Sequence, residues 1–208
     1  ATGEVYARST IDGGTARLIG GGQVSTLAVS NSAVLGGENT QLTGDVSQTS
    51  SVMVRSHNYA ATQYIPATAE FASQAAANAV SAVTTGSSHQ GLNITQAASG
   101  PWIEAGTSAN AGNAWDLAGR AHAAANQAVL NNRGGSMVIA ADQSSTATVR
   151  AESIVTSYDF GGVVSQAQAS GNTLTAGNNA IYLQLDTVQL NNGGVEARAG
   201  HAVERRLV

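Results

Sequence analysis

Polar and apolar residues alternate along several short stretches of the chain, and this period of two predicts β-strands. These stretches are rich in Val, Ile and Thr and cover residues 24–29, 41–48, 52–56, 137–140, 146–156 and 181–189. Turn signals made of Gly and Asn separate them, at residues 36–37, 131–135, 161–162 and 191–194. The pattern therefore predicts an all-β fold.

One segment is ambiguous, because the alanines of residues 67–83 favour a helix by propensity. The matching segment around Asn172 contains Ser-Gly-Asn-Thr-Leu-Thr, which is poor in helix-forming residues. Matching segments of a repeat share a conformation, so we predict a strand in both places.

Two amide residues recur along the chain at a nearly constant interval, which indicates an internal repeat. One series is Asn31, Asn78, Asn126 and Asn172, at intervals of 47, 48 and 46 residues. The other series is Gln48, Gln96, Gln143 and Gln189, at intervals of 48, 47 and 46 residues. Each Gln is followed six or seven positions later by an aliphatic and a charged residue, such as Val54 and Arg55. We therefore predict a degenerate repeat of about 47 residues.

This repeat favours a β-solenoid, also called a β-helix. Stacked strands lie ~4.8 Å apart and bring like residues together, so that Asn and Gln amides hydrogen-bond along the stack. We therefore interpret both amide series as structural ladders. A β-propeller is the alternative, since its blades have a similar length. Blades carry bulky aromatic motifs, however, and only 4% of the residues here are aromatic.

The predicted solenoid covers residues 24–199, between an N-terminal segment, 1–23, and a C-terminal tail, 200–208. The N-terminal segment contains an alternating strand whose alternate positions are Val5, Ala7, Ser9 and Ile11. The open end of a solenoid exposes strand edges to which another strand can add. The segment therefore caps its own chain or is donated to a neighbouring subunit, and the second interpretation makes the protein a filament subunit.

The sequence shows little chemistry for catalysis or cofactor binding. It has no Cys, its four histidines are isolated without metal-binding spacing, and it has no Gly-x-Ser-x-Gly motif. The carboxylates are spread along the chain rather than paired as glycoside hydrolysis requires. We predict no catalytic residue, no metal and no cofactor. A polysaccharide lyase or hydrolase on a β-helix scaffold is the alternative.

The few aromatic residues separate into two groups. Tyr59, Tyr64 and Trp102 are candidate contacts for a glycan or another partner, because exposed rings can stack on sugar rings. A second group recurs at intervals of 44 and 45 residues and is predicted to fill equivalent core positions, namely Phe71, Trp115 and Phe160.

Charge and hydropathy exclude two classes of partner. The formal net charge is −4 and the nine basic residues, all Arg, are scattered, so nucleic acid is not a predicted partner. No apolar run approaches the ~20 residues that span a bilayer as a helix. Few charges, no Cys, abundant Thr, Asn and Gly, and Ala1 in place of an initiator Met favour an exported bacterial protein.

The recurring Gln and Gly-Asn pattern also points to a family, through Gly-Asp-Val-Ser-Gln at residues 44–48 and Ala-Ser-Gly-Asn-Thr-Leu-Thr-Ala at 169–176. It resembles the holdfast anchor proteins of stalked alphaproteobacteria, specifically their adhesin-like D component, over about residues 24–199. The resemblance implies an outer-surface protein that tethers an adhesive polysaccharide to the cell envelope, together with sister anchor proteins. We therefore predict a non-enzymatic, extracellular adhesin, anchor or fibre subunit that assembles with further copies of itself.

Overall fold

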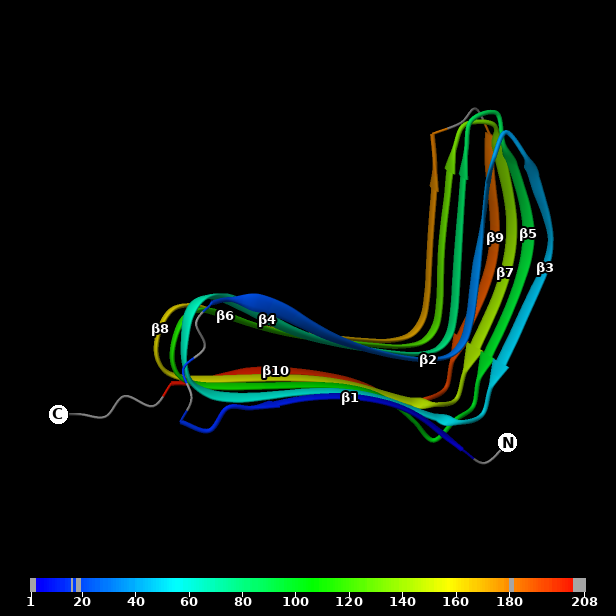
Figure 1. Ribbon diagram of the computed structural model, residues 1–208. Coiled ribbons are helices and arrows are strands. Elements are labelled where there is room, and N and C mark those ends of the chain that lie inside the picture. Colours follow the sequence, from blue (N-terminus) through cyan, green and yellow to red (C-terminus); the bar gives the residue numbers. More distant parts are fainter. Residues whose placement is uncertain (1–2, 16, 18–19, 180–181, 204–208) are drawn as a thin grey trace.

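The computed structural model describes residues 3–15, 17, 20–179 and 182–203, where all regular elements are strands (Figure 1). The strands are β1 (Glu4–Asp12), β2 (Gly22–Glu38), β3 (Gln41–Ser50), β4 (Met53–Thr85), β5 (His89–Ala98), β6 (Trp102–Arg133), β7 (Ser136–Ser145), β8 (Thr148–Asn178), β9 (Tyr182–Asn191) and β10 (Val195–Val203). The prediction of an all-β fold is confirmed. It holds for the alanine-rich segment 67–83 as well, which lies inside β4.

In the described residues all strand pairings are parallel, and they form two sheets. The first sheet has the order β1-β4-β6-β8-β10, with β2 also paired to β4, and the second has the order β3-β5-β7-β9. Paired residues lie between 46 positions apart, as for Trp102 and Thr148, and 49 apart, as for Glu4 and Met53. Parallel sheets are compatible with a β-helix. Propeller blades are antiparallel, so the β-propeller alternative is wrong.

The path of the chain has the shape of an L when it is viewed along the stack of strands (Figure 1). Strands β4, β6 and β8 each run along one side of a first arm, turn at its tip and return along its other side. They then bend upward to form one side of a second arm. The other side of the second arm is the sheet β3-β5-β7-β9. Side chains from both sides fill each arm.

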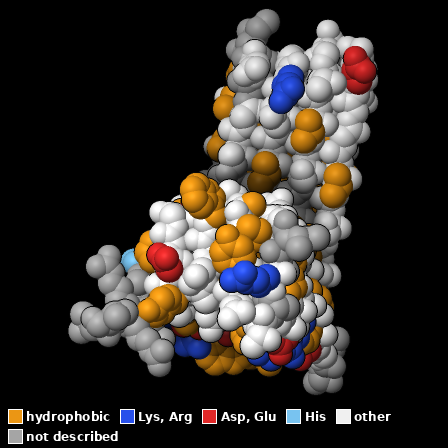
Figure 2. Space-filling model, turned by 60° about the vertical axis from the view of Figure 1, so that its left-hand side comes forward, with side chains coloured by type: hydrophobic (Ala, Val, Ile, Leu, Met, Phe, Trp, Pro, Cys, Tyr) orange, Lys and Arg blue, Asp and Glu red, His pale blue; other side chains and the backbone are white. Residues whose placement is uncertain are grey.

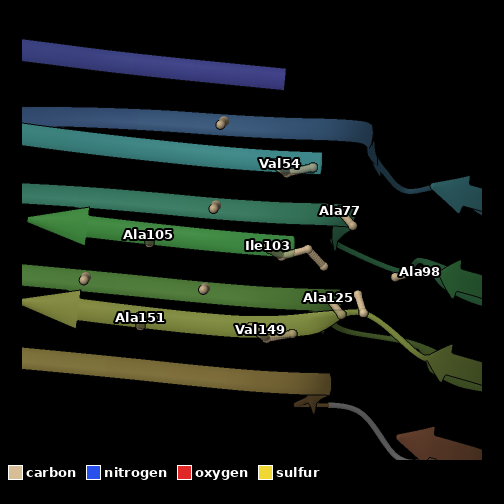
Figure 3. Packing of buried hydrophobic residues seen from close by; sticks show 13 residues of the cluster. Val54, Ala77, Ala98, Ile103, Ala105, Ala125, Val149 and Ala151 are labelled. Carbon is tan, nitrogen blue, oxygen red and sulfur yellow. The ribbon is translucent and has the colours of Figure 1, made fainter. Parts of the chain in front are cut away.

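Small residues dominate the core of the first arm near the bend. Val54, Ile103 and Val149 lie at neighbouring positions of β4, β6 and β8, and all three are fully buried (Figure 3). Alanines pack around them from both sides of the arm: Ala75, Ala77, Ala105, Ala123, Ala125 and Ala151. Such short side chains let the two sides approach closely, so the arm buries its interior without many large residues.

Larger residues fill two further clusters. One lies toward the tip of the first arm and includes Ile65, Phe71 and Leu117. The other lies in the second arm, between β4 or β6 and the second sheet, and includes Ile94 and Ile139. These clusters complete a core that runs along both arms.

Two of the predicted turns are wrong. Residues 36–37 lie within β2 and residues 161–162 lie within β8. The chain leaves β2 at Asn39 instead, where φ is 51°. Glycine permits extended backbone as well as turns, so a Gly pair alone does not end a strand.

The prediction of three equivalent aromatic core positions is also wrong. Phe71 is buried, but its register partner on β6 is Gly119 rather than Trp115. Trp115 is 66% exposed, at the tip where the register between β4 and β6 shifts. After this shift, paired residues of β4 and β6 are 48 positions apart in the sequence. Phe71 and Trp115 are only 44 positions apart, so they do not pair.

The predicted boundary of the C-terminal tail is wrong as well. Strand β10 continues to Val203, so residues 200–203 belong to a strand that pairs with β8. The remainder of the predicted tail, 204–208, lies outside the described residues.

Candidate functional site

The four glutamines of the repeated series lie side by side and form a hydrogen-bonded row, the Gln row (Gln48, Gln96, Gln143 and Gln189). The Nε2 of each later glutamine donates to the Oε1 of the one before it, over distances of 2.8, 2.7 and 2.6 Å. Gln96 and Gln143 are buried, and each also donates to a backbone carbonyl of the facing side of the arm. All the side-chain hydrogen bonds of the row therefore point in the same direction across the second sheet.

The four asparagines form a second row, the Asn row (Asn31, Asn78, Asn126 and Asn172). Here the direction is reversed, since each Nδ2 donates to the Oδ1 of the next asparagine, over 2.8, 2.8 and 2.7 Å. Each asparagine also donates to a backbone carbonyl near the end of a strand of the second sheet, as Asn78 does to Ala97. The Asn row thus ties the bend between the two arms to the second sheet.

Both ends of the Gln row retain hydrogen-bonding capacity within the described part of the chain. Gln48 donates one Nε2 hydrogen to the backbone oxygen of Ala79, which leaves its other hydrogen without an acceptor. Gln189 donates to Gln143, but its Oε1 accepts no hydrogen bond. One end of the row therefore presents a donor and the other end presents an acceptor.

The end of the stack formed by β9 also exposes the edge of the core. All ten residues of β9 are exposed. Leu183 and Leu185 are 47% and 41% exposed, although their register partners Met137 and Ile139 are buried. Leu183 and Leu185 are therefore the last members of two columns of core side chains, and no further strand of the described chain covers them. An exposed apolar edge of this kind marks a surface for association.

Strand β1 lies at the opposite end of the stack of strands from β9, where it covers part of the core. It pairs with β4 over its whole length. Val5, Ala7, Ser9 and Ile11 are half-buried, and three of them pack against core clusters. Within one chain, β1 is therefore the end strand of its own sheet, and its donation to a neighbouring subunit stays a prediction.

The three aromatic contact candidates do not form one site. Tyr59 and Trp102 are 40% and 41% exposed on the outer face of the first arm, but they line different hollows. The guanidinium of Arg150 lies 5.7 Å from the ring centre of Trp102. Tyr64 lies near the tip, where the guanidinium of Arg17 is 5.3 Å from its ring centre.

Other exposed apolar side chains near the tip were missed as contact candidates. Figure 2 turns this end of the molecule toward the viewer and shows separate hydrophobic side chains with few charged ones between them. Trp115 is the most exposed aromatic there and lines a hollow of about 310 Å³ with Tyr64 and Phe160. Its sequence context, Gly-Asn-Ala-Trp-Asp, carries the loop-like residues that signal such exposure.

Charged side chains of alternating sign line the outer face of the first arm. Paired positions on β4, β6, β8 and β10 carry Arg55, Glu104, Arg150 and Glu196. Arg55 lies 3.1 Å from Glu104 and 3.3 Å from Glu4, and Arg150 lies 3.0 Å from Glu196. Burial alone would lower the pKa of Arg55, but hydrogen bonds and charges of Glu104 and Glu4 raise it overall. In the sequence, this row is indicated by the charged residue that follows an aliphatic residue in each repeat, such as Arg55 after Val54.

Metal-binding groups do not gather in the described residues. No cluster of three or more His, Cys, Asp or Glu side chains that could hold a metal occurs in them. The same residues contain no helix that is long and apolar enough to cross a membrane. The features that stand out are instead the two amide rows, the open edge at β9 and the outer face of the first arm.

A family model described as holdfast attachment protein D matches residues 1–194 of the chain. The chain belongs to the holdfast attachment protein D family. This confirms the resemblance seen in the sequence and implies a role in holdfast attachment at the cell surface. The holdfast attachment protein D family is not a known enzyme family. Comparisons with curated proteins and with solved structures gave no match.

Proposed function

We propose that this protein is a β-solenoid of about 47 residues per coil that acts as a rigid, non-enzymatic connector at the bacterial surface. In this role it tethers an adhesive polysaccharide to the envelope, together with other surface anchor proteins. Family membership supports the attachment role. The observation that carries the proposal is the pair of continuous amide rows, because they lock every coil to the next.

The two rows give the rigidity that an anchor needs. Asn126 is fully buried and exchanges side-chain hydrogen bonds with the asparagines before and after it. Separating two coils under load breaks these bonds together with the backbone ladder between the coils, so many hydrogen bonds have to break at once. The coils therefore resist separation cooperatively.

The open ends support assembly of further copies into a fibre. In a head-to-tail stack the unused Nε2 hydrogen of Gln48 in one copy faces the free Oε1 of Gln189 in another. The neighbouring copy also covers the exposed Leu183 and Leu185. Such a contact joins two different surfaces, and because it continues the stack of coils along one axis without closing, it propagates into an open filament.

Assembly can be tested with two substitutions on the same exposed strand. Leu185→Lys places a charge on the apolar core edge, whereas Asp186→Lys places the same charge on the neighbouring position of β9. We expect the wild-type protein and Asp186→Lys to form concentration-dependent oligomers or fibres by light scattering and negative-stain microscopy. Leu185→Lys should stay monomeric with an unchanged circular dichroism spectrum. A wild-type protein that is monomeric at all concentrations contradicts the assembly.

The anchoring role itself is tested in cells. We expect a strain that lacks this protein to shed its adhesive polysaccharide into the medium while still producing it. Lectin staining of cells and of the cell-free medium measures both quantities. A deletion strain that retains the polysaccharide at its surface would refute the proposed function.

A further inference from the structure

A trough lies on the outer face of the first arm, above β6, because this strand carries two short side chains there. Gly106 and Ser108 lie between larger residues on both neighbouring strands. The two register rows across the trough are His57–Gly106–Glu152 and Tyr59–Ser108–Ile154. The hollow has a volume of about 390 Å³. This is within the range of pockets that hold small molecules or single groups of a larger ligand.

The walls of the trough are partly apolar. Tyr59 on β4 and Ile154 on β8 are 40% and 42% exposed and line it from opposite sides. Neighbouring strands lie ~4.8 Å apart, so these two walls rise from strands about 10 Å apart. That spacing admits one six-membered ring between the side chains. The open faces of Tyr59 and Ile154 supply the apolar contact for it.

Charged groups line the rest of the trough. Its two carboxylates, Glu104 and Glu152, are already paired, and Arg8, which also lines it, donates through its Nε to Thr10. Glu104 lies 3.1 Å from Arg55 and 3.5 Å from His57, and Glu152 lies 3.8 Å from Arg198. An anion would have to approach these carboxylates even if it paired with Arg8, and a cation would compete with the arginines that already pair with them. Hydroxyl groups have neither problem, since the carboxylate oxygens retain further acceptor capacity.

We propose that this trough binds one uncharged pyranose ring of a polysaccharide. The C–H face of the ring lies against Tyr59, and its hydroxyl groups donate to Glu104 and Glu152. A sugar ring has an apolar face and a polar rim, and it therefore matches a site with an aromatic wall and polar ends. This inference rests on the proposed attachment to a polysaccharide and specifies where the protein contacts it.

The test uses the purified full chain and two uncharged oligosaccharides, cellopentaose and N-acetylchitopentaose. Gly106→Val fills the trough and Tyr59→Ala removes its aromatic wall. Gly91→Val is the matched control, because Gly91 is also a strand glycine whose added Cβ would lie 3.1 Å from a histidine, as at Gly106, but in the other sheet. Thermal unfolding of each variant checks the fold, and titration calorimetry measures binding.

We expect at least one of the two oligosaccharides to bind the wild-type protein and Gly91→Val with equal affinity. Gly106→Val and Tyr59→Ala should each weaken this binding by at least about tenfold, which corresponds to about 1.4 kcal/mol. Raising the salt concentration from about 50 to about 500 mM should change the affinity less than about twofold, since no ion pair forms with the ligand. Absence of binding to the wild-type protein, or unchanged binding in both trough variants, would overturn the inference.

The same variants separate this inference from the proposed function. If deleting the protein releases the polysaccharide from cells but Tyr59→Ala and Gly106→Val retain it, the anchor stands and the trough is wrong. If the deletion strain itself keeps its polysaccharide at the surface, the proposed function is wrong, whatever the purified protein binds.

Discussion

The side-chain nitrogen of Gln143 lies 2.7 Å from the side-chain oxygen of Gln96, and both amides are buried inside the second arm. The two residues are 47 positions apart in the sequence but lie side by side in the paired strands β7 and β5. Each interior amide of the row contacts one amide before it and one after it. Replacing a residue in the middle of the row should therefore lower the stability of the protein more than replacing a residue at its end.

Replacing Gln96 by leucine should destabilise the protein strongly. Gln96→Leu leaves the Oε1 of Gln48 and one Nε2 hydrogen of Gln143 buried without partners. Each orphaned group costs about 1–3 kcal/mol, so we expect a loss of about 3 kcal/mol in the free energy of unfolding. Urea unfolding followed by circular dichroism measures it. Gln189→Leu, at the exposed end of the row, removes only one such partner, the donor to the Oε1 of Gln143, and should cost about half as much. Equal losses in the free energy of unfolding for the two variants would contradict a hydrogen-bonded row whose interior residues each satisfy two neighbours.

The turn between β6 and β7 should tolerate only glycine at its second position. Gly135 has a φ of 76°, and an added Cβ would collide with the backbone oxygen of Ser88 in the turn below it. Gly135→Ala should therefore cost at least about 2 kcal/mol of stability. Gly200→Ala is the control, since among the described residues nothing but its own chain neighbours lies within 4 Å of the position of its Cβ. Comparable melting temperatures for the two variants would contradict the prediction.

Mild acid should destabilise the protein through His122. Burial lowers the pKa of this histidine below its ordinary value of 6.5. The unfolded chain therefore binds the proton more readily, and the free energy of unfolding decreases as the pH falls below about 6.5. Above that pH the histidine is neutral in both states and makes no such contribution. The loss grows until the pH reaches the lowered pKa of the folded state.

The variant His122→Gln should show less of this pH dependence. Glutamines occupy the paired positions on both neighbouring strands, Gln74 and Gln168, so the amide side chain is accommodated in this row. We expect the stability difference between the wild-type protein and the variant to shift in favour of the variant from pH 7 to pH 5. Parallel stability curves over this range would show that His122 is not responsible.

The ion pair between Arg55 and Glu104 should contribute little, and only at low salt. Both side chains are partly exposed, and such pairs stabilise proteins by about 0–1 kcal/mol. Glu104→Gln should therefore lower stability by about 0.5 kcal/mol at low ionic strength, and by less at high salt because the charges are screened. Glu152→Gln serves as the comparison, since its contact with Arg198 is 3.8 Å and more exposed. A loss that persists in high salt would indicate a role other than electrostatic pairing.

Much of the local structure could be predicted from the sequence, because parallel stacking selects the same residue types at paired positions. The register joins Asn31 to Asn78 and Gln48 to Gln96, as members of one series in each case. An amide stacked on an amide satisfies its own hydrogen bonds, so each series marks a shared position. The same comparison between segments predicted a strand for the alanine-rich residues 67–83 against their helix propensity.

The sequence by itself thus determined the all-β class, the family and the alignment of the amide rows, since these depend on local alternation and on side chains that pair with their own kind. Only the tertiary structure decided the L-shaped path, the exposure of Trp115 and the trough over Gly106. Alternation shows which faces of a strand differ, but not in which direction a long strand bends. That direction depends on packing between segments such as those that carry Ala77 and Ala105, which lie far apart in sequence and meet only in the folded chain.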